Sequence, residues 1–318
     1  MDTVKSFPAK LGLGALALLA TSAAYGRNIE PLPRPALTDF LIGEEQYVKT
    51  RAEDTLVDLA ERHGIGYREL QLANPRLDPW LPGEGKTVVL PKKFLLPHGP
   101  REGIVLNTAE MRLYYYPADD NETVMTFPVS VGRQDWQTPL GPTRLVRKRR
   151  DPPWYPPASI LEEARADGRE LPARVPPGPD NPLGQFALDL AIPGYLIHGT
   201  NRPLGIGMPV THGCIRLHPE DIRVLYDRVP ENTPVTLIHQ PFKVGWHDDV
   251  LYLEVHPPLR NEDSIDLSVM VQAVIRETES VSRYWVNWEH ARSIANNPDG
   301  LPHPIGRAVR TAERVTLR

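Results

Sequence analysis

The sequence lacks three features that would each assign it to a broad class of protein. It has one cysteine in 318 residues, which excludes a disulfide framework within the chain. Its 36 basic and 40 acidic residues give a net charge of −4, which disfavours a polybasic nucleic-acid-binding protein. No apolar run is long enough to span a bilayer of ~30 Å. The sequence has instead 35 prolines, 41% hydrophobic residues and a length typical of roughly two globular domains with many loops.

Residues 1–26 have the pattern of a secretory signal peptide. Lys5 and Lys10 precede an apolar run at 11–20, and small residues follow at 22–26. The alternative interpretation is a buried N-terminal helix. No cysteine near this junction could carry a lipid anchor. We therefore expect cleavage near residues 24–26 and a soluble exported protein, with no integral membrane segment after cleavage.

After a proline-rich linker at 27–42, residues 43–95 are predicted to form strand, helix, helix and strand. Asp54 is the predicted cap of the first helix, and the second helix ends at Asn74-Pro75. The segment contains Tyr47-Val48, Asp54-Thr55-Leu56, His63, Leu70, Asn74-Pro75 and Val89-Leu90-Pro91. Through these residues and the order of its elements it resembles the LysM module, a peptidoglycan-binding βααβ unit. The alternative interpretation is a small packing domain that binds no sugar.

Residues 100–240 are predicted to be mainly β, as a sandwich or barrel with one or two helices. One helix is expected to begin at Pro219, where apolar residues recur at helical spacing. A proline-rich insertion at 150–184 contains Trp154 and a short helix at 160–166. It is interpreted either as a lid over a binding site or as a surface excursion. The expected strands are 103–106, 111–116, 124–131, 143–147, 186–190, 195–198 and 235–238.

Residues 241–318 are predicted to form a hairpin and a partly helical extension. The hairpin is expected at 244–256, with helices at about 267–275 and 284–295. A basic tail follows and is expected to be mobile and solvated, with contact to an acidic polymer as the alternative. The tail arginines are Arg307, Arg310, Arg314 and Arg318.

The lone cysteine lies in the most informative stretch of the sequence. Two histidines, His198 and His212, lie within sixteen residues of Cys214. A thiol attacks as the thiolate, and its usual pKa of ~8.5 leaves little thiolate at neutral pH. A neighbouring imidazolium would increase the thiolate fraction, so Cys214 is a candidate nucleophile.

The glycines near Cys214 suit a catalytic turn. His198 is expected at the end of a strand, and the loop that follows can return Cys214 beside it. Gly213 would let the backbone amides at 212–214 face a developing oxyanion. Arg216 offers a planar cation for a carboxylate, although it could equally brace the loop.

Three other interpretations stay open at this point. The first is a tetrahedral zinc site formed by His198, His212, Cys214 and His218, which have suitable ligand types. The second is a buried, inert cysteine with satisfied histidines. The third is a binding protein with a vestigial site.

The stretch resembles the YkuD-type L,D-transpeptidase family, in which a histidine is followed after about fifteen residues by Ser/Thr-His-Gly-Cys. His198, the motif at 211–214 and Arg216 match without gaps. With the LysM-like unit, the chain is similar to the periplasmic subgroup that attaches a Braun-type lipoprotein to peptidoglycan. The segments 101–105, 113–117 and 181–184 add to this resemblance.

The resemblance implies the roles of the site residues. Cys214 is the expected nucleophile, His198 its general base, Gly199 the carbonyl that orients the imidazole, and His212 a support of the oxyanion site with Gly213. Arg216, Thr211 and Trp154 are the expected substrate-binding residues. The implied substrate is a peptidoglycan tetrapeptide stem, which loses D-Ala and passes to an amine, with no metal or other cofactor. The acceptor is expected to be a lysine of an outer-membrane lipoprotein, with another stem or water as alternatives.

Overall fold

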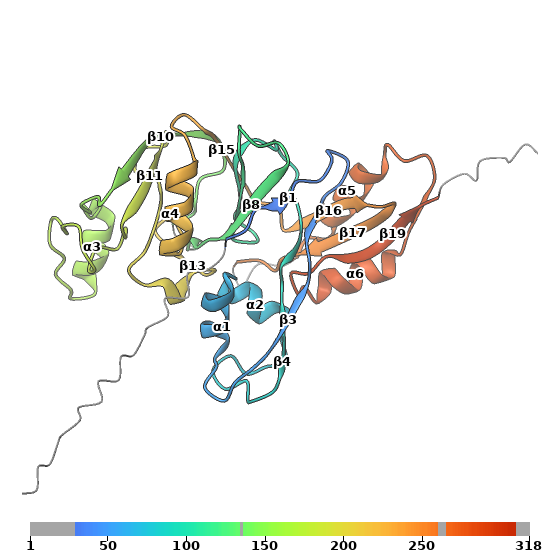
Figure 1. Ribbon diagram of the computed structural model, residues 1–318, viewed down its shortest axis with the longest axis horizontal. Helices are drawn as coiled ribbons and strands as arrows, with labels where there is room; N and C mark the ends of the chain where they lie inside the picture. The colour runs from blue at the N-terminus through green and yellow to red at the C-terminus, as the bar shows by residue number, and fades with distance from the viewer. Residues whose placement is uncertain (1–28, 134–135, 260–264, 310–318) are drawn as a thin grey trace, which may run out of the picture.

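The computed structural model describes residues 29–133, 136–259 and 265–309. They form an N-terminal part, a central part built on a large sheet, and a C-terminal part (Figure 1). The predicted signal peptide and the tail arginines Arg310, Arg314 and Arg318 lie outside the described residues. None of the described helices is long and apolar enough to cross a membrane.

A nine-stranded sheet forms the centre of the molecule. Its buried residues include Ile104, Leu188 and Ile197, and helix α4 (Pro219–Arg228) covers the same core with Ile222 and Leu225. The predictions of a mainly β region and of a helix beginning at Pro219 are confirmed. In order across the sheet, the strands are β1 (Leu32–Pro33), β8 (Thr123–Pro128), β7 (Arg112–Tyr116), β6 (Gly103–Asn107), β15 (Pro234–Ile238), β10 (Gly141–Arg150), β11 (Phe186–Leu190), β12 (Leu196–His198) and β14 (Ile215–Arg216).

Four short elements lie beside this sheet in the described part of the chain. The strand predicted at 124–131 is interrupted after β8, and its last residue begins β9 (Val131–Gly132), which pairs with β13 (Pro209–Thr211) instead. The insertion contains α3 (Ala158–Ala166), which extends the predicted helix by two residues. A single 3-10 turn, η1 (Pro203–Gly205), lies between His198 and β13.

The N-terminal part has the predicted order of two strands around two helices. Strands β3 (Gln46–Lys49) and β4 (Thr87–Leu90) pair in antiparallel fashion beside α1 (Leu56–His63) and α2 (Tyr67–Ala73). Asp54 does not cap α1 as predicted. Thr55 is the cap, in a reciprocal capping box with Asp58, whereas the Asp54 carboxylate accepts from Arg62 Nη2 at 2.7 Å. Two further strands, β2 (Leu41–Gly43) and β5 (Lys93–Leu95), pair nearby.

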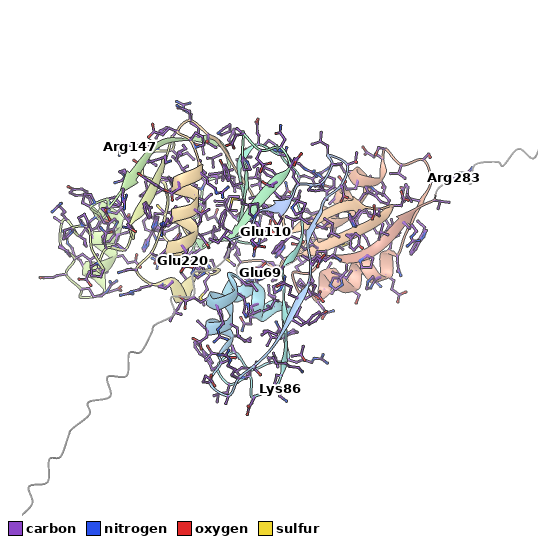
Figure 2. The ribbon with its side chains drawn as sticks, in the orientation of Figure 1. Glu69, Lys86, Glu110, Arg147, Glu220 and Arg283 are labelled. Atoms are coloured by element: carbon purple, nitrogen blue, oxygen red, sulfur yellow. The ribbon has the colours of Figure 1, made fainter. Side chains whose placement is uncertain are left out.

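Helix α2 joins all three parts of the molecule. At its first turn, Tyr67 N donates to the Ile206 carbonyl at 3.0 Å, in the loop between η1 and β13. Glu69 receives Arg112 Nη2 of the central sheet at 2.6 Å, and Arg68 donates to the Pro258 carbonyl at 2.6 Å. Figure 2 places Glu69 near the middle of the molecule, where the parts meet. The N-terminal part is therefore docked on the loop that leads to Cys214.

The C-terminal part is a four-stranded sheet rather than a hairpin with helices alone. The predicted hairpin is present as β16 (Phe242–His247) and β17 (Val250–Val255), and α5 (Leu267–Thr278) is the first predicted helix. The helix predicted at 284–295 is wrong at its start. Residues at its beginning form β18 (Tyr284–Val286), and Asn287 then caps α6 (Trp288–Asn296) through a bond from His290 N.

The prediction of a mobile tail is also wrong for its first arginine, Arg307. Arg307 lies within β19 (His303–Ala308), which pairs with both β17 and β18. Apolar residues from this sheet and from α5 and α6 form a separate core that includes Leu253, Val274, Ala295 and Ile305. Pairing with β19 explains why residues 284–286 form a strand and not the start of a helix. Tyr284, Trp285 and Val286 are aromatic or β-branched, and such residues suit a strand where a partner strand is present.

Candidate active site

The parallel pairing of β12 with β14 brings the predicted histidine and cysteine to one face of the sheet. Ile197 lies opposite Ile215, and both side chains are buried in the core. Side chains alternate along a strand, so His198 and Arg216 project from the other face, and Cys214, which directly precedes β14, is two residues from Arg216 and so is expected on that same face. His198 lies directly opposite Arg216, on a neighbouring strand about 4.8 Å away, and Arg216 is two residues from Cys214. The register of β12 with β14 thus permits the predicted approach of Cys214 to His198.

The His198 ring is held in one tautomer. Nδ1 lies 2.7 Å from the carbonyl oxygen of Gly199, which only accepts, so Nδ1 carries the proton and Nε2 has the lone pair of the neutral ring. Burial, followed by the positive charge of Arg216, lowers the pKa of His198 to about 3. The imidazole is therefore neutral near pH 7 and has the protonation state of a general base.

The thiol of Cys214 is half-buried beside the same strand. Its Sγ donates to the Gly194 carbonyl at 3.6 Å, and burial raises its pKa, with smaller opposing effects of the Leu196 backbone and Arg216. This differs from the predicted imidazolium next to a thiolate. Both groups are neutral at rest, because burial penalises each charged form.

The turn that carries Cys214 is fixed by contacts of its neighbours. Thr211 is 2% exposed, and its hydroxyl donates to the Cys214 carbonyl at 2.6 Å, so it braces the turn. Its contact with substrate stays a prediction. Gly213 has a φ of +97°, and a Cβ there would lie 2.8 Å from the Tyr195 ring. Thr138 Oγ1 donates to the Gly213 carbonyl at 2.9 Å. A side chain at position 213 would therefore disturb the turn.

His212 is bound to the insertion through a partner that sequence reasoning missed. Its Nε2 lies 2.6 Å from Glu163 Oε2 on α3, and Arg133 Nη2 reaches the other oxygen, Oε1, at 2.5 Å. The bonds from Arg133 and then from His212 lower the pKa of Glu163 to about 2. The Trp136 ring lies 5.3 Å from the His212 ring. No sequence signal pointed to Glu163, because 49 residues separate it from His212.

Trp154 lies at the base of the insertion. Its backbone exchanges two hydrogen bonds with Val175, at 2.9 and 2.8 Å, which closes the insertion into a loop. Asn181, fully buried, donates to the Pro152 carbonyl at 2.8 Å and fixes the same base. The described contacts of Trp154 thus hold the insertion together and do not join it to Cys214.

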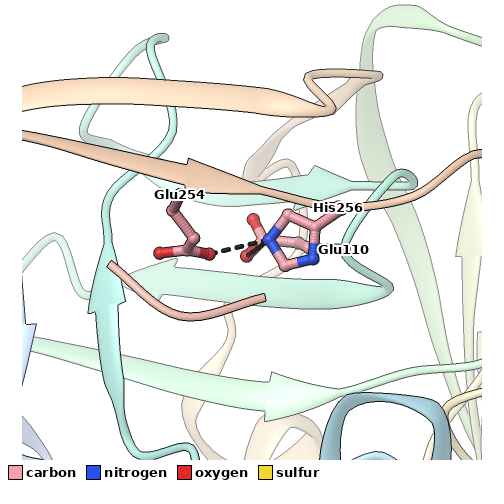
Figure 3. Close-up of side chains that lie close together, drawn as sticks. All are labelled: Glu110, Glu254 and His256. Carbon is pink, nitrogen blue, oxygen red and sulfur yellow. Dashed lines mark hydrogen bonds and ion pairs between the residues drawn. The ribbon is translucent and has the colours of Figure 1, made fainter. Parts of the chain in front are cut away.

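The four residues of the zinc interpretation, His198, His212, Cys214 and His218, do not form a group of converging ligand atoms. Within the described ranges, the one group of three candidate ligands with converging atoms is Glu110, Glu254 and His256, far along the chain from Cys214 (Figure 3). Lys243 Nζ already occupies that group, at 2.5 Å from Glu110 Oε2 and 2.6 Å from Glu254 Oε1. Burial opposes the charge of Lys243, yet the two carboxylates keep its pKa raised. The cluster is thus a buried network in which Lys243 pairs with two carboxylates, and its contact with Glu110 joins the C-terminal part to the central part. Removing one partner of a buried ion pair typically costs about 3–5 kcal/mol.

Comparisons with known proteins identify relatives of this chain. Residues 101–237 match the family model YkuD, the L,D-transpeptidase catalytic domain. The probable L,D-transpeptidase YcfS of Escherichia coli K12 is 43% identical over 246 residues, which cover 76% of this chain and 77% of the relative. The probable L,D-transpeptidase ErfK/SrfK of the same organism is 38% identical over 87% of this chain and 91% of its own length. The chain therefore belongs to the YkuD-type L,D-transpeptidase family.

A solved L,D-transpeptidase from Mycobacterium tuberculosis H37Rv is more distant. It is 21% identical, with a TM-score of 0.31, over 46% of this chain and 60% of that one.

Proposed function

We propose that this protein is a periplasmic cysteine L,D-transpeptidase that forms a thioester with a peptidoglycan tetrapeptide stem and passes it to an amine. The observation that supports the cysteine mechanism is the shared sheet face of Cys214, His198 and Arg216. The neutral, Nδ1-protonated state of His198 adds to it, because the Nε2 lone pair is then available for the thiol proton.

In the first half-reaction, the Cys214 thiol transfers its proton to His198 Nε2, and the sulfur attacks the carbonyl between the L-centre of the diamino acid and D-Ala. The backbone amides near Gly213 are the proposed donors to the oxyanion. The C–N bond then breaks, and the imidazolium returns the proton to the departing amine of D-Ala. The products are a thioester on Cys214 and free D-Ala, and no nucleotide is consumed.

In the second half-reaction, an acceptor amine attacks the thioester and gives a proton to His198. The tetrahedral intermediate expels the thiolate, which recovers that proton. A C-terminal lysine of an outer-membrane lipoprotein is the proposed acceptor, by similarity to the subgroup with a LysM-like unit. A side-chain amine of a second stem, which would give a 3–3 cross-link, is the second candidate.

The other predicted residues take supporting roles in this proposal. Arg216, whose buried Nε has no hydrogen-bond partner among the described residues, is proposed to hold a substrate carboxylate. His212 is proposed to support the oxyanion site. The insertion that contains Trp154 is proposed to cover the donor stem, and the Glu163 contact to His212 supports this role. The LysM-like unit is proposed to bind the glycan strand.

The thioester is tested by mixing the chain without residues 1–26 with a purified tetrapeptide muropeptide and recording the intact mass. We expect an adduct equal to the donor minus D-Ala, which is absent in Cys214→Ala. Adding either a lysine-terminated lipoprotein peptide or a second stem then identifies the acceptor by which one discharges the adduct. A wild-type chain that forms no adduct would contradict the proposal.

A further inference from the structure

A row of side chains crosses four strands on the face that carries Cys214. Arg149 of β10 lies opposite Ala187 of β11, Ala187 lies opposite His198 of β12, and His198 lies opposite Arg216 of β14. Directly opposed residues in paired strands point to the same face. His198 therefore has an arginine on each side: Arg216 on the adjacent strand β14, and Arg149 on β10, beyond β11.

Arg149 belongs to a pair of arginines that share one carboxylate. Arg149 Nε and Nη2 lie 3.0 and 2.8 Å from Asp189 Oδ1, and Arg147 Nε and Nη2 lie 2.7 and 2.6 Å from Oδ2. Asp189 is only 8% exposed, so it fixes both guanidinium groups in place. Figure 2 shows Arg147 near the end of the sheet that is remote from the C-terminal part. Two positive charges on one negative charge leave this pair with a net charge of about +1.

The geometry of these contacts leaves donors free. Each arginine uses its Nε and Nη2 edge toward Asp189, and a guanidinium has five N–H groups. The edge formed by Nη1 and Nη2 therefore stays available for a second, bidentate contact with a carboxylate.

Lys148 and Arg150, the other two basic residues of the run 147–150, point away from this face. Lys148 Nζ lies 4.8 Å from the centre of the Tyr226 ring on α4, and the Arg150 guanidinium lies 5.8 Å from that of Phe186. The alternation of the strand thus divides one basic run, 147–150, between two faces. It directs Arg147 and Arg149 toward the side of Cys214 and His198.

We propose that Arg149, held by Asp189 together with Arg147, is a second carboxylate-binding site that receives a carboxylate of the donor stem peptide beyond the one assigned to Arg216. The inference rests on the proposed function, because a tetrapeptide stem carries several carboxylates, at its C-terminus and on its acidic and diamino-acid residues. A strand spacing of about 4.8 Å puts the backbones of Arg149 and Arg216 roughly 14 Å apart, which an extended stem of four residues can span.

The electrostatics around His198 agree with this site. After burial, the charges of Arg216 and, more weakly, Arg149 contribute to its low pKa, whereas the carbonyls of Gly199 and Leu183 raise it. Carboxylates that bind both arginines would offset these positive charges. The imidazole would then accept the thiol proton more readily when the donor is in place than when the site is empty.

The test compares Arg149→Gln with Arg150→Gln, a matched loss of charge one residue away on the opposite face. Each variant is acylated with the tetrapeptide stem and with stems in which one internal carboxylate is replaced by a carboxamide, and the rate of adduct formation is recorded against donor concentration. We expect Arg149→Gln to raise KM about 10- to 100-fold for the carboxylate donor, as expected for loss of a charge-assisted pair. One carboxamide donor should react equally with Arg149→Gln and wild type, and Arg150→Gln should behave as wild type with every donor.

The outcomes separate the two proposals. Equal KM values for Arg149→Gln and wild type with the carboxylate donor overturn the second site and leave the thioester mechanism standing. A change of the same size with every donor also overturns it, because Arg149 would then act only on His198 or on the fold. If wild-type protein forms no adduct with any donor, the proposed function itself fails.

Discussion

Replacing Gly207 by alanine separates the N-terminal part from the loop that precedes the catalytic motif. Gly207 has a φ of +86°, and a Cβ at this position would lie 2.4 Å from Gly66 Cα and 2.6 Å from Tyr67 N. Both contacts are with backbone atoms at the start of α2, which no side-chain rotation can relieve. The two backbones must therefore move apart.

The expected cost follows from two effects. A residue other than glycine in the left-handed region costs about 1–2 kcal/mol. Separation also removes the bonds from Tyr67 N to the Ile206 carbonyl at 3.0 Å and from Arg68 N to the Gly207 carbonyl at 3.4 Å. Each such bond contributes about 0.5–1.5 kcal/mol, so we expect the free energy of unfolding to fall by roughly 2–5 kcal/mol. A shift of about 1 Å in the motif would also slow acylation of Cys214 by about 100-fold.

Gly205→Ala is the matched control in the same loop. A Cβ on Gly205 meets no atom within 4 Å, so this variant should keep wild-type stability and acylation. Urea unfolding followed by tryptophan fluorescence measures the first quantity, and intact mass against time measures the second. Gly207→Ala that matches Gly205→Ala in both assays would refute the docking of α2 on this loop as a determinant of the site.

Two further predictions concern protonation and the insertion. Because the pKa of His198 is about 3 in the folded state and ~6.5 when unfolded, the unfolded state gains a proton first as pH falls. Stability should therefore decrease between pH 6.5 and 3 with a slope of up to ~1.4 kcal/mol per pH unit, and His198→Gln should lack this component in urea titrations. An equal slope in both proteins would contradict the buried neutral state. Glu163→Gln breaks the contact of α3 with His212 and should raise the ratio of hydrolysis to transfer severalfold, measured by product analysis, whereas Glu162→Gln, an exposed neighbour, should leave it unchanged. A ratio that Glu163→Gln does not alter would contradict the role of the insertion as a cover.

Local sequence pattern was sufficient where an element depends on its own residues. The strand at 186–190, the helix from Pro219 and the order of the N-terminal helices all follow from periodicity, proline and turn residues. The pattern failed at Tyr284, because the choice of strand over helix there depends on pairing with β19. It also failed at Asp54, since two adjacent residues are both suitable caps and the ion pair with Arg62 selects between them.

The sequence by itself determined the chemistry that this protein offers: one thiol, two histidines and an arginine in a glycine-rich stretch. Only the tertiary structure decided their state. Parallel pairing of β12 with β14 gives Cys214 and His198 a common face, and burial makes both neutral. The partners Glu163 and Arg149 come from distant parts of the chain. Their contacts arise from strand register and packing, which join residues that local pattern cannot relate.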